Sequence, residues 1–142
     1  MAQKYPYQAQ LEQSCRAVAT EIARRASAPQ LPAWKLVFQS RSGRPEDPWL
    51  EPDVCDYLRE LSRDGTPGAV LCPIGFVCDH IEVLYDLDTE AAEVAAQLSL
   101  PMARASAVND HPRFVEALAD AVADTVARYA NGRPLPIVPV AA

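Results

Sequence analysis

Carboxylates and an imidazole are concentrated in one short stretch, Pro73-Ile-Gly-Phe-Val-Cys-Asp-His-Ile-Glu-Val-Leu-Tyr-Asp-Leu-Asp-Thr-Glu90. In a helix, 100° per residue would place Glu82, Asp86, Glu90 and Glu93 within about 80° of one another, and His80 stands just before Glu82 at the helix start. Residues 64–103 contain no lysine or arginine that could neutralise this stripe. Carboxylate and imidazole ligands at such spacing are those that a hydrated divalent cation prefers. The pattern therefore indicates a candidate site for cation or proton chemistry.

The same residues also fit a purely structural interpretation. An acidic face is commonly a solvated helix surface, and Asp79 with Glu82 three residues later forms a plausible capping box at a helix start. His80 at that position can equally be a capping or surface residue. Under either interpretation the helix should bury its opposite side, which would hold the apolar residues Ile81, Leu84, Ala91, Ala95 and Leu98.

Helical and extended patterns alternate along the chain, separated by many of its 13 prolines. We expect helices over residues 7–27, 53–63, 79–98 and 111–130, the second ending at Asp64-Gly65. Strands are expected over residues 34–39, 69–74 and 102–108. The tail from 131 to 142 is proline-rich and is expected to be irregular.

This alternation predicts an α/β fold, a parallel sheet with helices on both faces. Ligands of such folds bind outside the carboxyl ends of the strands. That rule points to three loops, at residues 40–49, 75–79 and 108–112. The second loop leads directly into the acidic helix.

Composition excludes several classes of protein. The chain has 142 residues, 49% of them hydrophobic, which suits one folded domain. The net charge of −6 argues against nucleic acid and anionic membranes as partners. No apolar run is long enough for a transmembrane helix, and the start lacks the pattern of a secretory signal, so a cytoplasmic location is expected. Cys15, Cys55 and Cys72 are expected to be small buried thiols, with Cys78 partly exposed at the loop.

Three blocks of sequence resemble the ferrochelatase family, whose members insert ferrous iron into a porphyrin. The first is the 73–90 stretch with its Asp-His-Ile-Glu-Val-Leu-Tyr-Asp-Leu-Asp string. The second is Phe38-Gln-Ser-Arg-Ser-Gly-Arg-Pro-Glu-Asp-Pro-Trp-Leu-Glu-Pro52, and the third is Asn109-Asp-His-Pro-Arg-Phe-Val-Glu-Ala-Leu118. They keep the family's order and spacing. The sequences of these blocks most resemble those of bacterial members, including those that use coproporphyrin III rather than protoporphyrin IX.

The resemblance implies roles for particular residues. Glu82 matches the active-site glutamate that faces the porphyrin, as iron ligand or proton acceptor, and His80 matches the neighbouring catalytic histidine. Asp86 and Glu90 match an acidic line that serves as a second metal site or a proton exit. Trp49 matches an aromatic residue near the macrocycle, although it could instead be a loop anchor packed on the core.

The same resemblance suggests a substrate contact for Arg41. Its guanidinium could bind a propionate of the porphyrin as a bidentate donor. The alternative is a loop arginine paired with Glu46 or Asp47.

The family's fold is a Rossmann-like, chelatase-like three-layer sandwich, usually present twice in chains more than twice this length. Residues 1–142 resemble only the C-terminal domain. The N-terminal domain and the first strand of this domain, which in the family carries a further active-site histidine, are expected to be missing. The chain is therefore expected to act as a partial chain or half-enzyme, with the missing half or a second copy as a further partner. The alternatives are a non-catalytic porphyrin-, metal-binding or assembly module, or a small chelatase for another metal or tetrapyrrole.

No resident cofactor is expected, because porphyrin and Fe²⁺ are substrates. Some relatives hold an iron–sulfur cluster in a cysteine-rich tail. The tail here has no cysteine, so no cluster is predicted.

Overall fold

The computed structural model describes residues 6–27, 33–40, 44, 49–130 and 132. They divide into two compact units, one extending to Ala107 and the other beginning at Val108. Each unit is described by itself below. The prediction that residues 1–142 form one C-terminal-type domain stays a prediction, and so does that of an irregular tail, because the tail lies outside the described residues except for Gly132.

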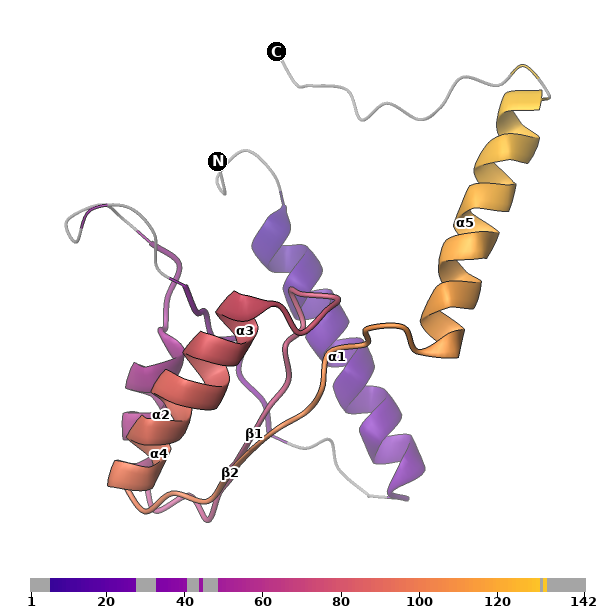
Figure 1. Cartoon of the computed structure of the whole chain (residues 1–142). Helices are drawn as coiled ribbons and strands as arrows, with labels where there is room; N and C mark the ends of the chain where they lie inside the picture. Colours follow the sequence, from indigo (N-terminus) through magenta and orange to yellow (C-terminus); the bar gives the residue numbers. More distant parts are fainter. Residues whose placement is uncertain (1–5, 28–32, 41–43, 45–48, 131, 133–142) are drawn as a thin grey trace. The chain divides into compact units, whose positions relative to one another are not determined.

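The first unit is an α/β arrangement built on a short parallel sheet (Figure 1). Strand β1 (Ala69–Leu71) pairs in parallel with β2 (Met102–Arg104), with Val70 opposite Ala103. The crossover consists of α3 (Ile81–Tyr85), the π-helix η1 (Asp86–Ala91) and α4 (Ala92–Gln97). The predicted parallel α/β character is thus confirmed, whereas the two strands are shorter than predicted.

Two further helices complete this unit. Helix α1 (Tyr7–Arg25) and helix α2 (Val54–Arg63) occupy the predicted segments. Asp53 caps α2 by accepting hydrogen bonds from the backbone N–H groups of Cys55 (2.8 Å) and Asp56 (3.3 Å). In Figure 1, α2 and α4 lie on one side of the strands and α1 on the other.

The predicted stop after α2 is a Schellman motif. Gly65 adopts a φ of +70°, a conformation that glycine takes without a steric penalty. Its N–H donates to the carbonyl of Ser62 (3.1 Å), and the N–H of Thr66 donates to the carbonyl of Leu61 (3.0 Å). The carbonyls at the helix end are thereby satisfied.

The predicted strand over residues 34–39 is wrong. Its segment makes only an isolated parallel bridge between Phe38 and Asp53. The N–H of Phe38 donates to the carbonyl of Pro52, and its carbonyl accepts from the N–H of Val54, both at 2.9 Å. The segment is separated from the residues after β1 by a cavity that both line, so no ladder forms between them.

The hydrophobic core lies between α2 and the crossover helices. Val54 and Leu58 of α2 pack against the crossover, and Leu58 and Val83 are the largest fully buried side chains. Ala69 and Leu71 of β1 pack against this cluster, whereas Val70 points away from it and is 74% exposed. The buried core residues are Val54, Leu58, Val83, Leu87, Ala91, Ala95 and Leu100.

The buried face of the crossover differs from the one that the helical wheel predicts. Ala91 and Ala95 are buried as expected, but Ile81 is 75% and Leu84 40% exposed. Buried positions recur instead every four residues, from Val83 to Ala95. An ideal α-helix would rotate such a stripe by 40° at each step. The wider turn of the π-helix compensates for that rotation.

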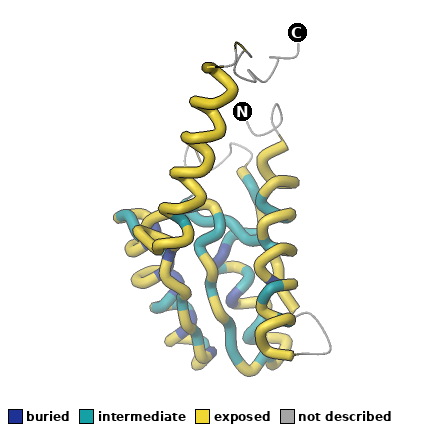
Figure 2. Tube along the Cα trace, turned by 90° about the vertical axis from the view of Figure 1, so that its right-hand side faces the viewer, coloured by how far each residue is buried: buried dark blue, intermediate teal, exposed yellow. Residues whose placement is uncertain are grey.

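The second unit consists mainly of α5 (Pro112–Ala130), close to the predicted bounds. None of its residues is buried (Figure 2). Among the described residues of both units, no helix combines the length and apolar character needed to cross a membrane.

Candidate functional site

A cavity of about 1130 Å³ opens beside the carboxyl end of β1. This volume is at the upper end of the range for small-molecule sites. Its walls come from α1, from the segments on either side of residues 41–48, and from the residues that follow β1. The lining residues are Tyr7, Leu11, Cys15, Lys35, Leu36, Val37, Phe38, Gln39, Ser40, Trp49, Leu50, Val54, Leu71, Cys72, Pro73, Ile74, Gly75, Phe76, Glu82 and Leu87.

Most of this lining is apolar and aromatic, and its charged members are few. Glu82 is the carboxylate in the lining, and Lys35 is the cation. Trp49 lines the cavity while remaining 39% exposed. Tyr7 of α1 lies close to Gly75, where a Cβ would be 3.4 Å from the Tyr7 Oη, an ordinary van der Waals distance. A large, mainly apolar cavity lined by one carboxylate and one ammonium group suits a mainly hydrophobic ligand that carries anionic groups.

The acidic residue in the cavity stands at the start of the crossover helices. His80 is the N-cap of α3, and its Nδ1 accepts a hydrogen bond from the backbone N–H of Glu82 (3.2 Å). The Nδ1 lies 4.0 Å from Oε2 of Glu82, whose side chain is 60% exposed. The ring of Phe76 meets the imidazole edge-on, with 4.3 Å between centroids. The His80 cap and the Phe76 ring therefore fix the turn that presents Glu82.

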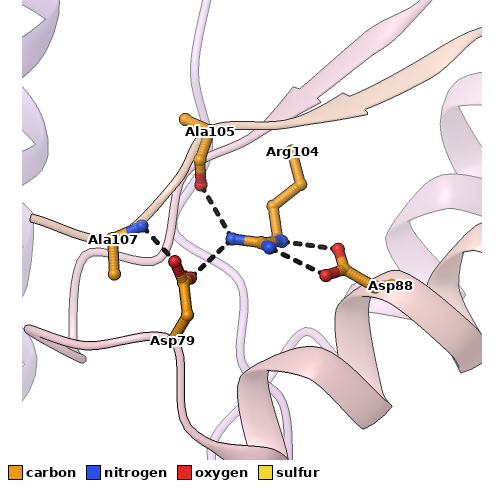
Figure 3. A network of polar contacts seen from close by, with 5 residues as sticks. All are labelled: Asp79, Asp88, Arg104, Ala105 and Ala107. Atoms are coloured by element: carbon orange, nitrogen blue, oxygen red, sulfur yellow. Dashed lines mark hydrogen bonds and ion pairs between the residues drawn. The ribbon is translucent and has the colours of Figure 1, made fainter. Parts of the chain in front are cut away.

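The capping box that the sequence suggested for Asp79 and Glu82 does not form, because His80 takes the capping position. Asp79 instead reaches across to β2, where its Oδ1 accepts from Nη1 of Arg104 (2.7 Å) and from the N–H of Ala107 (3.2 Å) (Figure 3). Arg104 also forms a bidentate pair with Asp88 of η1, at 2.5 and 2.7 Å. Hydrogen bonds from Arg104 lower the pKa of Asp88 below its usual value.

The acidic stripe diverges along the crossover. Asp86 is half-buried and accepts hydrogen bonds from the hydroxyl of Ser40 and from Nε2 of Gln39 (3.4 Å). Glu90 lies where its charge contributes to raising the pKa of Cys55 in α2, behind the larger effects of burial and of Asp53. Of the three predicted metal ligands, therefore, only Glu82 lines the cavity.

Metal ligation and catalysis by these residues stay predictions. Within the described part of the chain, no three His, Cys, Asp or Glu side chains stand close enough together to hold a metal ion. Arg41, proposed for a propionate, lies outside the described residues, as do Glu46 and Asp47.

Cys15, Cys55 and Cys72 are all less buried than expected. Cys72 is exposed, because it directly follows β1 and lines the cavity. Cys15 and Cys55 are half-buried, and Cys78 is exposed as expected. Partial burial raises the pKa of the Cys15, Cys55 and Cys72 thiols. These three groups are consequently thiols rather than thiolates at neutral pH.

Sequence reasoning missed Lys35, Phe76 and Arg104. For Arg104 a signal was present, since it is the first lysine or arginine after residues 64–103, a run of 40 positions that contains neither. Phe76 lies in the loop at residues 75–79 that the sequence singled out, but its contact with His80 was not predicted. Lys35 gave no such signal, because its place in the cavity depends on how distant segments pack.

Comparison with known proteins agrees with the motifs. The Ferrochelatase family profile matches residues 1–126. A coproporphyrin III ferrochelatase of Streptomyces griseus is 55% identical over 94 residues, covering 66% of this chain and 25% of that protein. One from Mycolicibacterium vanbaalenii is 49% identical over 107 residues, covering 75% of this chain and 32% of that protein.

A ferrochelatase of Rhodopirellula baltica is 45% identical over 135 residues, covering 94% of this chain and 36% of that protein. The chain thus spans about a quarter to a third of the length of the curated relatives that it matches. The family profile covers most of the 142 residues, and the chain therefore belongs to the ferrochelatase family.

Proposed function

We propose that this chain forms part of a porphyrin metal-insertion site, in which Glu82 acts on a porphyrin bound in the cavity. The observation that carries the proposal is the position of Glu82, a carboxylate in an otherwise largely apolar and aromatic wall. Coproporphyrin III is the proposed porphyrin, with protoporphyrin IX as the other candidate, because the Streptomyces and Mycolicibacterium relatives are named for coproporphyrin III. The product would be a haem or its precursor.

The proposed reaction exchanges two protons for one cation. Both pyrrole N–H protons leave the porphyrin as Fe²⁺ forms bonds to its four nitrogens, so charge is conserved. The carboxylate of Glu82 accepts one pyrrole proton as general base and the second proton passes to water, while the carboxylate oxygens are also suitable ligands for an arriving Fe²⁺. Iron and porphyrin are substrates here, so the chemistry requires no resident cofactor and no iron–sulfur cluster.

His80 has a more restricted role in this proposal. Because its Nδ1 accepts from the N–H of Glu82, the neutral ring carries its proton on Nε2. In that form it donates a hydrogen bond rather than accepting a proton. We assign it to holding the turn and stabilising negative charge, with Asp86 and Glu90 as later positions on a proton or metal path.

The aromatic wall would bind the macrocycle. Trp49 lines the cavity and is 39% exposed, and its indole would stack on the macrocycle. Arg41 would contact a propionate carboxylate. A region of the protein beyond these 142 residues, or a second copy, would supply the opposite wall, in keeping with the fraction of its relatives that the chain spans.

The finer fold proposed is a three-layer sandwich. Its support is the parallel βαβ unit, with α2 and the crossover packed on one side. Helix α1 lies on the other side of the strands (Figure 1), and Val70 of β1 remains exposed.

Porphyrin binding tests the location of the site. Trp49→Ala should weaken the dissociation constant for coproporphyrin III by about tenfold, the loss of one aromatic stacking contact. Trp34→Ala is the matched control, because Trp34 is equally exposed (39%) and is absent from the cavity lining. Equal affinities of both variants and the unaltered chain, measured by absorbance titration, would refute this placement of the porphyrin.

A further inference from the structure

The guanidinium of Arg104 bridges the two ends of the segment that contains Glu82. Arg104 binds Asp79 through Nη1 (2.7 Å) and Asp88 through Nε and Nη2 (2.5 and 2.7 Å). Figure 3 shows the guanidinium between the two carboxylates. Asp79 precedes His80 directly, and Asp88 follows Glu82 by six residues in η1. Both ends of the segment 79–88 are thereby tied to the same side chain of β2.

The surroundings shield part of this contact from solvent. The side chain of Arg104 is 14% exposed, that of Asp79 is 21% exposed and that of Asp88 is 39% exposed. Nη1 of Arg104 also donates to the carbonyl of Ala105 (3.2 Å), and Asp79 accepts from the N–H of Ala107 (3.2 Å). Bidentate arginine–carboxylate pairs fix direction as well as distance, which a lysine ammonium cannot do.

The chain of contacts runs from β2 to the cavity. Arg104 fixes Asp79, the next residue is the N-cap His80, and Nδ1 of His80 holds the N–H of Glu82 (3.2 Å). Rotation of the Asp79 side chain would move His80. That movement would change the hydrogen bond that Nδ1 of His80 accepts from the N–H of Glu82. Small misplacements of a reacting group reduce rates strongly.

We infer that Arg104 is a positioning residue for the metal-insertion site, which aligns Glu82 through Asp79 and His80. Its effect on catalysis rests on the proposed function, whereas its effect on the geometry of the turn does not. The two parts therefore require separate measurements.

The geometric part is tested by nuclear magnetic resonance of the complete chain. In the unaltered protein, the ¹⁵N shifts of His80 should show the Nε2–H tautomer, and the Glu82 amide should be protected from hydrogen exchange. Arg104→Gln should shift His80 toward a mixture of tautomers and reduce protection of the Glu82 amide at least tenfold. Arg104→Lys should give an intermediate result, because lysine keeps the positive charge but cannot form the bidentate pair.

Arg59→Gln is the matched control. It removes an arginine–aspartate pair of the same length, Arg59 with Asp56 at 2.7 Å, in α2 and outside the 79–88 segment. Its His80 and Glu82 signals should match those of the unaltered chain. If Arg104→Gln does not fold, Asp79→Ala serves in its place, because it removes the oxygen that accepts from Arg104 and leaves the Arg104–Asp88 pair.

A folded Arg104→Gln or Asp79→Ala variant with unchanged His80 and Glu82 signals would overturn the inference. The catalytic part predicts that Arg104→Gln lowers kcat for iron insertion by about tenfold or more while KM for the porphyrin changes less than twofold. A rise in KM with kcat unchanged would also overturn it. Absence of insertion by the unaltered chain would refute only the proposed function, since the resonance measurements do not depend on turnover.

Discussion

Asp86 of the π-helix accepts a hydrogen bond from the hydroxyl of Ser40, 46 residues earlier in the chain. Ser40 holds a φ of +59°, in the left-handed region that a serine seldom adopts. The contact ties the segment that lines one wall of the cavity to the helix that carries Glu82. Asp86 thus has a structural partner, and its proposed place in a proton or metal path must be compatible with that contact.

Two substitutions of Ser40 separate the hydrogen bond from the backbone conformation. Ser40→Ala should destabilise the chain by about 1 kcal/mol, because it leaves the half-buried Asp86 carboxylate without its hydroxyl donor. Ser40→Gly should cost less, because glycine favours the positive φ while losing the same hydrogen bond. Urea denaturation measures both changes. Equal stability of Ser40→Ala and the unaltered chain would show that the contact contributes nothing.

Leu87 and Leu84 test the helical register. Leu87 is 4% exposed and Leu84 is 40% exposed. Leu87→Ala should reduce the free energy of unfolding by about 2–5 kcal/mol, whereas Leu84→Ala should cost less than about 1 kcal/mol. A regular α-helix without the π-turn predicts the reverse order. Chemical denaturation of the two variants decides between these registers.

Lys35 should contribute to the affinity for anionic porphyrins. Lys35→Gln is expected to weaken coproporphyrin III binding about twofold to fivefold at low salt, as for an exposed ion pair. The difference should shrink at high ionic strength and vanish for a porphyrin whose carboxyl groups are esterified. Arg63→Gln is the control, because Arg63 is exposed in α2 and is absent from the cavity lining. Salt-independent weakening would contradict this electrostatic role.

The pair of Arg104 and Asp88 gives stability a pH dependence of known sign. Hydrogen bonding to Arg104 lowers the pKa of Asp88 in the folded chain. Its contribution is therefore complete above the unfolded-state pKa of about 3.9 and is lost as the pH falls through the lower folded-state pKa. Asp88→Asn should be less stable than the unaltered chain at pH 6, and the difference in melting temperature should narrow below pH 4. A difference that widens toward acid would contradict the pairing.

The order of the helices and strands could be predicted from local sequence patterns, but the contacts within the site could not. Helices α1, α2 and α5 and the parallel βαβ unit were predictable because prolines and apolar periodicity delimit them. The π-helix was not, because spacing alone does not distinguish a regular turn from a widened one. That widened turn accounts for the buried positions that recur every four residues from Val83 to Ala95.

The site could be located from the sequence only in outline. The loop before Glu82 was expected at a strand end, and the cavity lies there. The partners of Asp79 and Asp86 were not predictable, because Arg104 and Ser40 reach them from distant segments. The strand expected at 34–39 does not form, for a related reason. A strand needs a neighbouring strand to pair with, and the backbone of Phe38 instead makes hydrogen bonds with Pro52 and Val54.

The most direct test of the account is the rate of metal insertion into coproporphyrin III by the chain and by Glu82→Gln, followed by absorbance under anaerobic conditions. The unaltered chain should accelerate insertion over the spontaneous rate, and Glu82→Gln should lose about 100-fold or more of that acceleration, as expected for loss of a general base. Glu93→Gln, exposed in α4 and outside the cavity lining, should retain it. Equal rates for Glu82→Gln and the unaltered chain, or porphyrin binding without any acceleration, would contradict the role assigned to Glu82.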